Sequence, residues 1–445
     1  MDLEPPGPKG LPVIGNNRQY ARNPLRFLTA CREAYGNVVK LQLGREDEPT
    51  YMLNDPAAIE RVLVGEEERF RKATFGDPAL EQLLGSGLLF SEGMFWKQQR
   101  QLAQPAFQPD RIQSLGGMMT DYTQSMLEEW DPDSVVDIQR AMATVTVRII
   151  VDAMFDTTLK SALTERLQEA LLPIGSRFEP SFRRVLLPEW VPTEENRTYQ
   201  TAVETLDEIL EELIRRRRGT ESEGDDLLSI LLRAQDDPAY DLSNHQLRDE
   251  LMTMLLAGHD TTALALTYTW YLLDENPEVR KRFHEELDAA IDDTTPTVED
   301  VMGLETTDRI LTESMRLYPP VYIMFREPIE DITIDEYPIQ AGTPLLLSQW
   351  AVHRDDRFYE NPEQFDPDRW RRDRARERPN FAYFPFGGGP RHCIGKHLAM
   401  LEAKLILATI GSQYRLDRID HGPLDISCSL TLHPSDPVEM RVIER

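Results

Sequence analysis

A loop with three consecutive glycines and a cysteine constrains this chain more than any other segment. Residues 386–395 read FGGGPRHCIG. Glycine lets a backbone approach a ligand closely, and Cys393 comes just before an apolar run, residues 394–410, that predicts a helix. A sulfur at a helix N-terminus, beside Arg391 and His392, is biased toward the thiolate. A thiolate on such a loop is a metal ligand or a nucleophile, and the loop alone leaves both open.

Composition excludes several other classes of protein. The 445 residues are 40% hydrophobic, enough for a substantial core. Three scattered cysteines without CxxC spacing argue against a disulfide framework and a Cys-rich zinc site. No signal pattern and no run of 18 apolar residues occurs. We therefore expect no transmembrane anchor and a cytoplasmic location.

The charge balance is strongly acidic. Net charge is −28, and only eight of the 49 basic residues are lysines. This balance argues against nucleic acid or an anionic membrane as a partner. An acidic, lysine-poor surface suits a high-salt cytoplasm, where ions screen self-repulsion, so we expect a halophilic source. An ordinary acidic protein is the alternative.

Apolar periodicity predicts a mainly α protein with small β-sheets at both ends (α+β). Residues 38–44 and 50–53 predict a hairpin, and strands are expected at 332–334, 343–347, 430–432 and 438–442. Helices are expected at 57–64, 79–84, 94–104, 110–130, 135–155, 160–173, 196–217, 225–234, 244–273, 276–291 and 304–317.

Within the long helix expected at 244–273, residues 255–264 read LLAGHDTTAL. Gly258 weakens the helix, and the Thr261 hydroxyl can bond the Ala257 carbonyl four residues back. Asp260 and Thr261, an acid beside an alcohol, could pass protons to a bound species. A purely structural kink explains the pattern equally well.

Two further pairs are weak signals by themselves. Glu313 and Arg316 share one helix face, as many solvated surface pairs do. Trp96 and Arg100, four residues apart, could hold an anionic group together or could be an edge-of-core tryptophan beside a solvated arginine.

Taken together and in this order, these motifs resemble the cytochrome P450 superfamily of haem-thiolate monooxygenases. The cysteine signature F-x-x-G-x-R-x-C-x-G is matched in full, and residues 365–370, FDPDRW, resemble the family's meander. The family's A-G-x-D/E-T-T, E-x-x-R and W-x-x-x-R patterns are matched by Ala257 to Thr262, Glu313 with Arg316, and Trp96 with Arg100. The resemblance covers nearly the whole chain.

The resemblance implies one domain over 1–445, shaped like a triangular prism, without a fused reductase. It implies haem b with Cys393 as the axial thiolate, whose electron donation favours O–O cleavage. Thr261 and Asp260 would deliver protons to O2, and Glu313 with Arg316 would form a buried ion pair with the meander. His259 departs from the pattern and stays uninterpreted, a solvated or core histidine being favoured over a second proton donor. The implied cofactor contacts are Trp96, Arg100, Ala257, Gly258, Arg326, Phe386, Arg391, Cys393 and Gly395.

The expected substrate is a small hydrophobic molecule such as a fatty acid, terpenoid, steroid or carotenoid-derived compound. The expected pocket residues are Phe75, Leu88, Leu89, Leu256, Ala265, Val321, Ile323, Met324 and Leu430. Electrons would come from a separate ferredoxin or flavodoxin, for which the arginines of 369–378 form a local basic island. A solvated charged loop explains that island equally well.

Two other functions compete with an O2-dependent monooxygenase. A haem-thiolate enzyme that uses peroxide would have less need of Asp260 and Thr261. A haem sensor or carrier without turnover would need neither residue. The intact acid–alcohol pair favours the monooxygenase.

Overall fold

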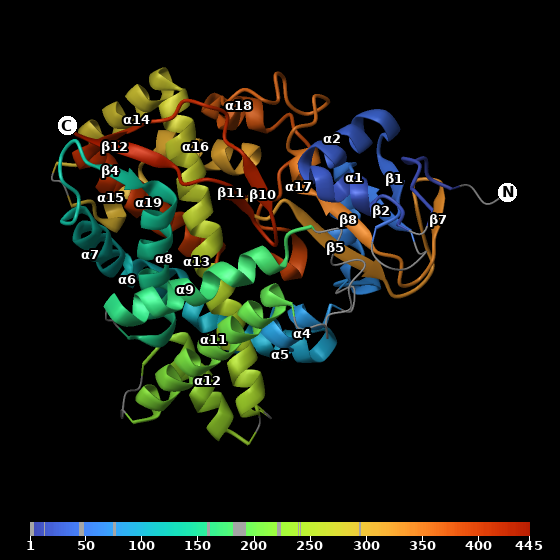
Figure 1. Cartoon of the computed structure of the whole chain (residues 1–445), viewed down its shortest axis with the longest axis horizontal. Helices are drawn as coiled ribbons and strands as arrows, with labels where there is room; N and C mark the ends of the chain where they lie inside the picture. The colour runs from blue at the N-terminus through green and yellow to red at the C-terminus, as the bar shows by residue number, and fades with distance from the viewer. Residues whose placement is uncertain are drawn as a thin grey trace.

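The computed structural model describes residues 4–12, 14–43, 49–73, 77–157, 161–180, 193–219, 224–238, 240, 242–292 and 295–445. Most helices lie on one side of the molecule (Figure 1). On the other side, with the N-terminus and the helices α1 (Asn17–Arg22) and α2 (Pro24–Tyr35), lie the strands β1 (Val38–Leu41), β2 (Thr50–Leu53), β5 (Ile323–Pro328) and β8 (Leu345–Ser348). The expected mainly α architecture with small sheets is confirmed.

Several helices begin at a residue whose side chain accepts hydrogen bonds from their first free N–H groups. Asp137 accepts from Gln139 and Arg140 at the start of α8, and Ser243 forms a capping box with Gln246 at the start of α13. The α-helices are α1 (Asn17–Arg22), α2 (Pro24–Tyr35), α3 (Pro56–Glu60), α4 (Pro78–Leu84), α5 (Gly93–Ala103), α6 (Pro109–Ser114), α7 (Gly116–Leu127), α8 (Ile138–Phe155), α9 (Ser161–Arg177), α11 (Glu194–Arg218), α12 (Leu227–Asp236), α13 (Asn244–Glu275), α14 (Pro277–Ala290), α15 (Val298–Met302), α16 (Glu305–Leu317), α17 (Gln349–Val352), α18 (Arg372–Ala375) and α19 (Lys396–Gln413).

Two helix predictions were wrong at their boundaries. The helix expected at 110–130 is two helices, α6 and α7, which meet at Leu115. The helix expected from 135 begins at Ile138, because Val135–Asp137 forms strand β4 and pairs with the C-terminal strand β12 (Glu439–Glu444). β-Branched residues pack well in a strand once a partner is present, and the partner lies about 300 residues away in the sequence.

The main sheet joins the two ends that the sequence analysis treated separately. Its strand order is β1-β2-β8-β5-β3, and the parallel pair β2–β8 aligns Tyr51 with Leu345. The strands are β1 (Val38–Leu41), β2 (Thr50–Leu53), β3 (Phe70–Arg71), β5 (Ile323–Pro328) and β8 (Leu345–Ser348), with hairpins β6 (Ile332–Ile334)–β7 (Tyr337–Ile339) and β10 (Ile426–Cys428)–β11 (Leu432–Pro434), and strand β9 (Tyr414–Arg418) beside β12.

Helix α13 runs through the core. Its C-terminal half is buried almost continuously from Thr262 to Leu273, as expected of a helix covered on all sides. A Cβ atom at Gly258 would lie 2.6 Å from Cδ1 of Ile150, so the missing side chain lets α8 pack closely against α13. None of the described helices is long and apolar enough to cross a membrane.

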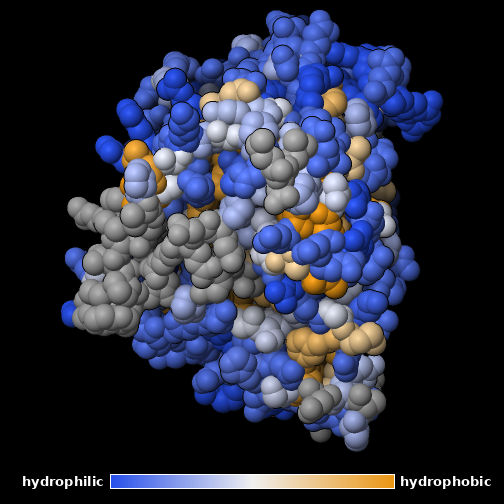
Figure 2. Space-filling model, turned by 90° about the vertical axis from the view of Figure 1, so that its right-hand side faces the viewer, coloured by the Kyte–Doolittle hydropathy of each residue, from blue (hydrophilic) through white to orange (hydrophobic). Residues whose placement is uncertain are grey.

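The described part of one face of the surface is mostly hydrophilic. On the face turned toward the viewer in Figure 2, hydrophobic side chains appear as separate patches within a largely hydrophilic surface. This pattern agrees with the net charge of −28.

Candidate functional site

One large, partly open cavity of about 1510 Å³ brings the predicted site residues together. Its lining includes all nine expected cofactor contacts, from Trp96 to Gly395, as well as Asp260 and Thr261. The described members of the expected substrate pocket also line it; Phe75 lies outside the described residues. Motifs hundreds of residues apart in the sequence therefore face one space.

The cysteine loop presents Cys393 to this cavity on a fixed backbone. Gly387 and Gly389 have φ of 69° and 65°, a region that favours glycine. A Cβ atom at Gly389 would lie 2.0 Å from the Leu63 carbonyl oxygen, so a side chain there would displace the loop. The Cys393 N–H donates to the Phe386 carbonyl at 2.9 Å, which closes the loop immediately before α19.

The electrostatics of Cys393 differ from the sequence-based expectation. Burial raises the pKa of the Cys393 thiol, although the Gly395 N–H and the positive charges of Arg100 and Lys396 act to lower it. The expected bias toward the thiolate was therefore wrong for the protein alone. A coordinated metal cation deprotonates a thiol outright, so these donors serve to support a thiolate that a metal has already formed.

Four of the cationic side chains that border the cavity form one group, which we call the cavity cation cluster: Lys72, Arg100, Arg326 and Arg391. Burial, together with Arg326 and Arg391, holds the pKa of Lys72 well below its usual value. Burial and then Arg391 lower the pKa of Arg326 to about 10. Each cation lowers the pKa of its neighbours, so nearby negative charge would stabilise the cluster.

Glu92 supplies part of that negative charge. Arg391 Nη2 donates to Glu92 Oε2 at 2.6 Å and to the Ser91 carbonyl at 2.7 Å, and its guanidinium lies 4.5 Å from the centre of the Trp96 ring. Sequence reasoning missed both Glu92 and Lys72. Glu92 precedes the W-x-x-x-R helix directly, whereas no pattern distinguishes Lys72.

The residues present fit a flat, dianionic cofactor. Nη1 of Arg391 is buried and has no hydrogen-bond partner among the described residues. A buried guanidinium nitrogen without a partner is costly, and an anionic ligand in the cavity would satisfy it. Propionate carboxylates supply such oxygens, and the Cys393 sulfur in the same cavity supplies a ligand for iron.

Helix α13 places Asp260 and Thr261 in the cavity wall. The Thr261 hydroxyl donates to the Ala257 carbonyl at 2.9 Å, as expected. Asp260 does not point freely into the cavity, because its Oδ2 accepts from the Thr431 hydroxyl at 2.7 Å and lies 3.3 Å from His433 Nε2. The sequence analysis missed Thr431 and His433. His259 is buried, with Nδ1 lying 3.2 Å from the Leu255 carbonyl oxygen, in the way of a core histidine.

The second cationic group, which we call the meander cluster, comprises Glu313, Arg316, Arg369 and Trp370. Arg316 forms two hydrogen bonds with the Glu313 carboxylate, at 2.7 and 2.8 Å, and both side chains are fully buried. Glu313 also accepts from Arg369 Nε at 3.1 Å and from Trp370 Nε1 at 2.8 Å. The remaining N–H groups of Arg316 bond the carbonyls of His353, Pro362 and Gln364. The pair therefore fastens the segment around 353–370 onto α16.

The basic island expected at 369–378 is smaller than the sequence suggested. Arg369 is 2% exposed and belongs to the meander cluster. Arg378 is half-buried and stacks on Trp370 at 4.6 Å, and Arg374 pairs with Asp366 at 2.9 Å. Carbonyl and carboxylate groups, as well as the Trp370 ring, bind these guanidinium groups. The local sequence does not show these partners. Arg371, Arg372 and Arg376 stay exposed.

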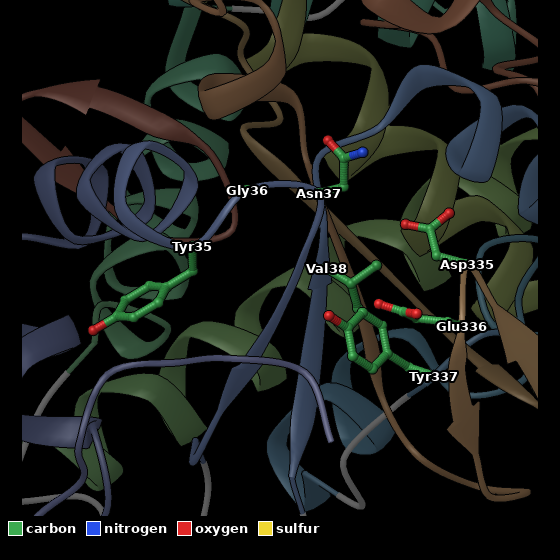
Figure 3. Close-up of a pocket in the computed structure, with 7 residues that line it drawn as sticks. All are labelled: Tyr35, Gly36, Asn37, Val38, Asp335, Glu336 and Tyr337. Carbon is green, nitrogen blue, oxygen red and sulfur yellow. The ribbon is translucent and has the colours of Figure 1, made fainter. Parts of the chain in front are cut away.

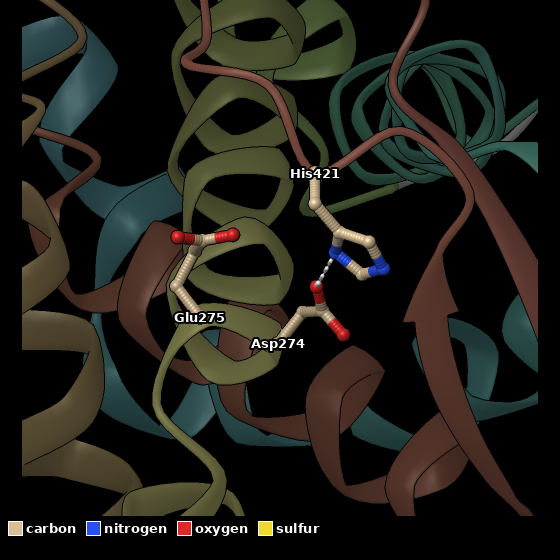
Figure 4. Close-up of side chains that lie close together, drawn as sticks. All are labelled: Asp274, Glu275 and His421. Carbon is tan, nitrogen blue, oxygen red and sulfur yellow. Dashed lines mark ion pairs between the residues drawn. The ribbon is translucent and has the colours of Figure 1, made fainter.

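A second hollow and a cluster of acidic side chains lie outside this site, and neither contains a thiol. A surface hollow between the end of α2 and the β6–β7 hairpin is lined by residues 35–38 and 335–337, with no cation or thiol (Figure 3). Asp274, Glu275 and His421 lie close together at the end of α13 (Figure 4). Arg280 and Arg418 already pair with the two carboxylates, at 3.1 and 2.9 Å.

Comparison with known proteins agrees with this geometry. The family model for cytochrome P450 matches residues 5–440. The fold is similar to the crystal structure of the haem domain of cytochrome P450DA, with a TM-score of 0.87, 28% identity, and coverage of 100% of this chain and 99% of that one.

Two relatives come from Streptomyces. The chain is 35% identical over 414 residues to cyclooctat-9-en-7-ol 5-monooxygenase of Streptomyces melanosporofaciens, covering 92% of this chain and 88% of the relative. It is 31% identical over 414 residues to pentalenene oxygenase of Streptomyces avermitilis, covering 92% and 90%. A plant relative, protein LUTEIN DEFICIENT 5 of Arabidopsis thaliana, is 28% identical over 465 residues, covering 98% and 77%.

The chain belongs to the cytochrome P450 family. It is a haem-thiolate monooxygenase that inserts one atom of O2 into an apolar organic substrate. The cofactor of this family is haem with a cysteine thiolate as the axial ligand. The enzyme uses O2, a small substrate and a redox partner.

Proposed function

We propose that Cys393 is the axial ligand and that the cavity cation cluster holds the haem propionates. The observation that carries this proposal is the coexistence, in one cavity, of a fixed Cys393 and an arginine whose buried Nη1 has no partner in the described part of the chain. When bound, the haem supplies the chemistry of O2 activation. The protein residues hold it, exclude water and move protons.

The roles of the remaining site residues follow from their positions. Trp96, stacked under Arg391, keeps the guanidinium oriented toward the cavity. Ala257 lines the cavity on α13, whereas Ile150 of α8 fills the space beside Gly258. Phe386 and Gly395 line the same cavity as the Cys393 sulfur. We assign proton delivery to Asp260 and Thr261, which share the cavity with Cys393.

The proposed substrate is a polycyclic hydrocarbon or its simple alcohol. The names of two relatives denote an alkenol and an alkene, and the cavity offers an apolar wall for such a molecule. Its members are Leu88, Leu89, Leu256, Ala265, Val321, Ile323, Met324 and Leu430. Apolar walls bind apolar ligands mainly by removing their surface from water.

An optical binding screen tests the substrate class. Polycyclic alkenes and alkenols are titrated into the ferric holoenzyme, together with fatty acids of similar carbon number. We expect saturable shifts of the haem spectrum with the polycyclic compounds and weakening of the shift in Leu256→Gln. Binding of fatty acids alone would overturn the proposed class.

We also propose that a separate ferredoxin or flavodoxin docks near Arg371, Arg372 and Arg376, and that residues 1–445 act as one domain in the cytoplasm. Exposed cations in an otherwise acidic protein support docking of an acidic partner. Arg371→Glu with Arg372→Glu should slow reduction without altering ligand-induced shifts. Arg26→Glu on α2 is the control, and equal reduction rates in all three proteins would overturn the docking site.

Adaptation to high salt is a further part of the proposal, and it rests on composition alone. A net charge of −28 destabilises the folded state by self-repulsion, and screening reaches a Debye length of about 3 Å near 1 M salt. The melting temperature should therefore rise between 0.1 and about 1 M KCl. An unchanged or falling melting temperature would remove the support for a halophilic archaeal source.

A further inference from the structure

The acid of the central helix is tied to the C-terminal hairpin by a histidine and a threonine. Asp260 lies on α13, whereas Thr431 and His433 lie at the β10–β11 hairpin. Thr431 Oγ1 lies 2.7 Å from Asp260 Oδ2 and 2.9 Å from His433 Nε2, and the direct separation of His433 Nε2 from Asp260 Oδ2 is 3.3 Å. The three side chains therefore form a closed triangle.

The chemistry of the three groups fixes where the protons lie. An ionised carboxylate only accepts hydrogen bonds, so the single proton of the Thr431 hydroxyl points to Asp260. The lone pairs of Thr431 then face His433 Nε2, which has to carry a proton and donate it. This order, from His433 through Thr431 to Asp260, forms a connected hydrogen-bonded path.

The hairpin is held in place independently of the triangle. The Tyr268 hydroxyl, two turns further along α13, donates to the Leu432 carbonyl at 2.9 Å. The Leu432 N–H donates to the Pro320 carbonyl at 3.0 Å. Asp260, Thr261, Thr431 and His433 all line the cavity that contains Cys393. The path therefore ends at the acid–alcohol pair.

The other end of the path reaches water. The His433 side chain is 28% exposed, and its surroundings include the exposed Glu179, whose Oε1 accepts from the Ser427 hydroxyl at 2.8 Å. His259 on α13 also acts on the pKa of Asp260, and Asp436, which follows the hairpin, lines the same cavity. Glu179 acts on the pKa of His433, so His433 is the member of the triangle on the side of this exposed residue.

We propose that His433 is a proton-relay residue of this monooxygenase, which recharges Asp260 through the Thr431 hydroxyl. In one step Thr431 gives its proton to Asp260 and receives the Nε2 proton of His433, and His433 regains a proton from water. Asp260 then passes its proton into the cavity beside Thr261. Each passage moves one proton from solvent into the cavity. The reaction consumes two protons and two electrons, so two passages accompany the two electrons that the redox partner supplies.

The charges of the pair define the state from which this transfer starts. Burial alone would lower the pKa of His433, but the Asp260 carboxylate, and after it Glu179, raise the pKa above its usual value. Burial alone would raise the pKa of Asp260, but His433, His259 and the Thr431 hydroxyl hold the pKa at about 2. His433 is thus kept protonated, and Asp260 ionised, over a wider pH range than the isolated groups. Because the pKa of His433 exceeds that of Asp260, transfer to Asp260 is uphill, and Asp260 holds the proton only until it passes into the cavity.

The inference rests on the proposed function of Asp260 and Thr261. The first test therefore measures the interaction between His433 and Asp260 without measuring turnover. Imidazole ¹⁵N resonances of the reduced, CO-bound holoenzyme, a diamagnetic species, are titrated in wild type and Asp260→Asn. We expect the His433 pKa to fall by about one unit in Asp260→Asn, because an opposite charge is lost at close range. An equal pKa in both proteins would overturn the inference.

A second measurement distinguishes a relay from a structural contact. His433→Gln keeps an N–H donor toward Thr431 but cannot exchange protons, so a structural role predicts wild-type behaviour. With a ferredoxin system and O2, without organic substrate, NAD(P)H oxidation is followed against pH. We expect the oxidation rate of wild type to fall as pH rises through the pKa of His433, and the rate of His433→Gln not to show this fall. Below that pKa the rate of His433→Gln should be on the order of tenfold lower than that of wild type.

The control is His421→Gln, which breaks the histidine–carboxylate pair with Asp274 at 3.8 Å on the same helix (Figure 4). It should keep the wild-type pH profile. A His433→Gln profile equal to wild type would overturn the relay while leaving the proposed function intact. Absence of a thiolate-type CO spectrum in the wild type would overturn the proposed function itself, and the relay with it.

Discussion

The two arginine-rich groups of this molecule, the meander cluster and the cavity cation cluster, are both buried but satisfied in different ways. In the meander cluster Glu313 and backbone carbonyls face each guanidinium, so the charges are balanced by the chain itself. In the cavity cation cluster Glu92 pairs with Arg391, yet Arg391 Nη1 has no partner among the described residues. Burial of a cation costs free energy in both cases. The first group therefore stabilises the fold, and the second is completed by an anionic ligand.

The largest expected effect comes from breaking the balanced group. Arg316→Ala leaves the Glu313 carboxylate buried beside fewer cations and should lower the free energy of unfolding by about 3–5 kcal/mol, in haem-free and haem-loaded protein alike. Urea unfolding measures this. Arg374→Ala, which removes a surface pair with Asp366 from the same segment, should cost less than about 1 kcal/mol. Equal losses in the two variants would contradict the distinction.

The unbalanced group should respond in the opposite way when haem is absent. Lys72→Met removes a buried cation whose neighbours already disfavour its charge, so the haem-free protein should be equally or more stable. The haem-loaded protein should lose haem roughly tenfold to a hundredfold faster, as expected for one charge-assisted hydrogen bond. Haem transfer to an acceptor globin measures the rate. Lys97→Met, an exposed lysine on α5, is the control, and a destabilised haem-free Lys72→Met protein would contradict the account.

The Asp260–His433 pair lies between these extremes, because it is balanced but titratable. The pKa of Asp260 is depressed to about 2 from 3.8, so its contribution is present above pH 4 and lost as pH falls toward 2. The pKa of His433 is raised above 6.5, so its contribution is present below pH 6.5 and lost as pH rises through the folded-state value. His433→Phe should therefore destabilise the protein more at pH 5.5 than at pH 9.5. A pH-independent difference in urea midpoints would contradict the pairing.

Salt should change the stability cost of breaking an exposed ion pair but not that of breaking a buried one, and this effect is the smallest of those expected. In 1 M KCl the cost of Arg374→Ala should shrink by a few tenths of a kcal/mol toward zero, because screening acts on exposed pairs. The cost of Arg316→Ala should stay the same, since ions do not reach a fully buried pair. A parallel decrease in both would show that the meander cluster is open to solvent.

Sequence patterns predicted the parts of the site that depend on local spacing. The Cys393 loop, the Ala257–Thr261 bond and the Glu313–Arg316 pair are each formed by residues a few positions apart in the sequence. Local patterns therefore placed the members of each motif correctly. Lys72, Glu92, Thr431 and His433 acquire their roles from partners far away in the sequence. The burial of Arg369 under Glu313, 56 residues away, belongs to the same class.

The fold follows the same division. Helix α13 is long and strongly patterned, and the structure begins it at the expected residue 244. Strand β4 was expected as helix, because only pairing with β12 near the C-terminus makes it a strand. Partners distant in the sequence thus decided both the misplaced strand and the missed site residues.

The assignment of Cys393 as the haem ligand is tested most directly by the absorption spectrum of the reduced, CO-bound protein. Wild type should show the Soret band typical of a thiolate ligand, and Cys393→Ser should lose that band while its fold, followed by circular dichroism, is retained. A thiolate-type band that persists in Cys393→Ser, or one that is absent from wild type, would contradict the account.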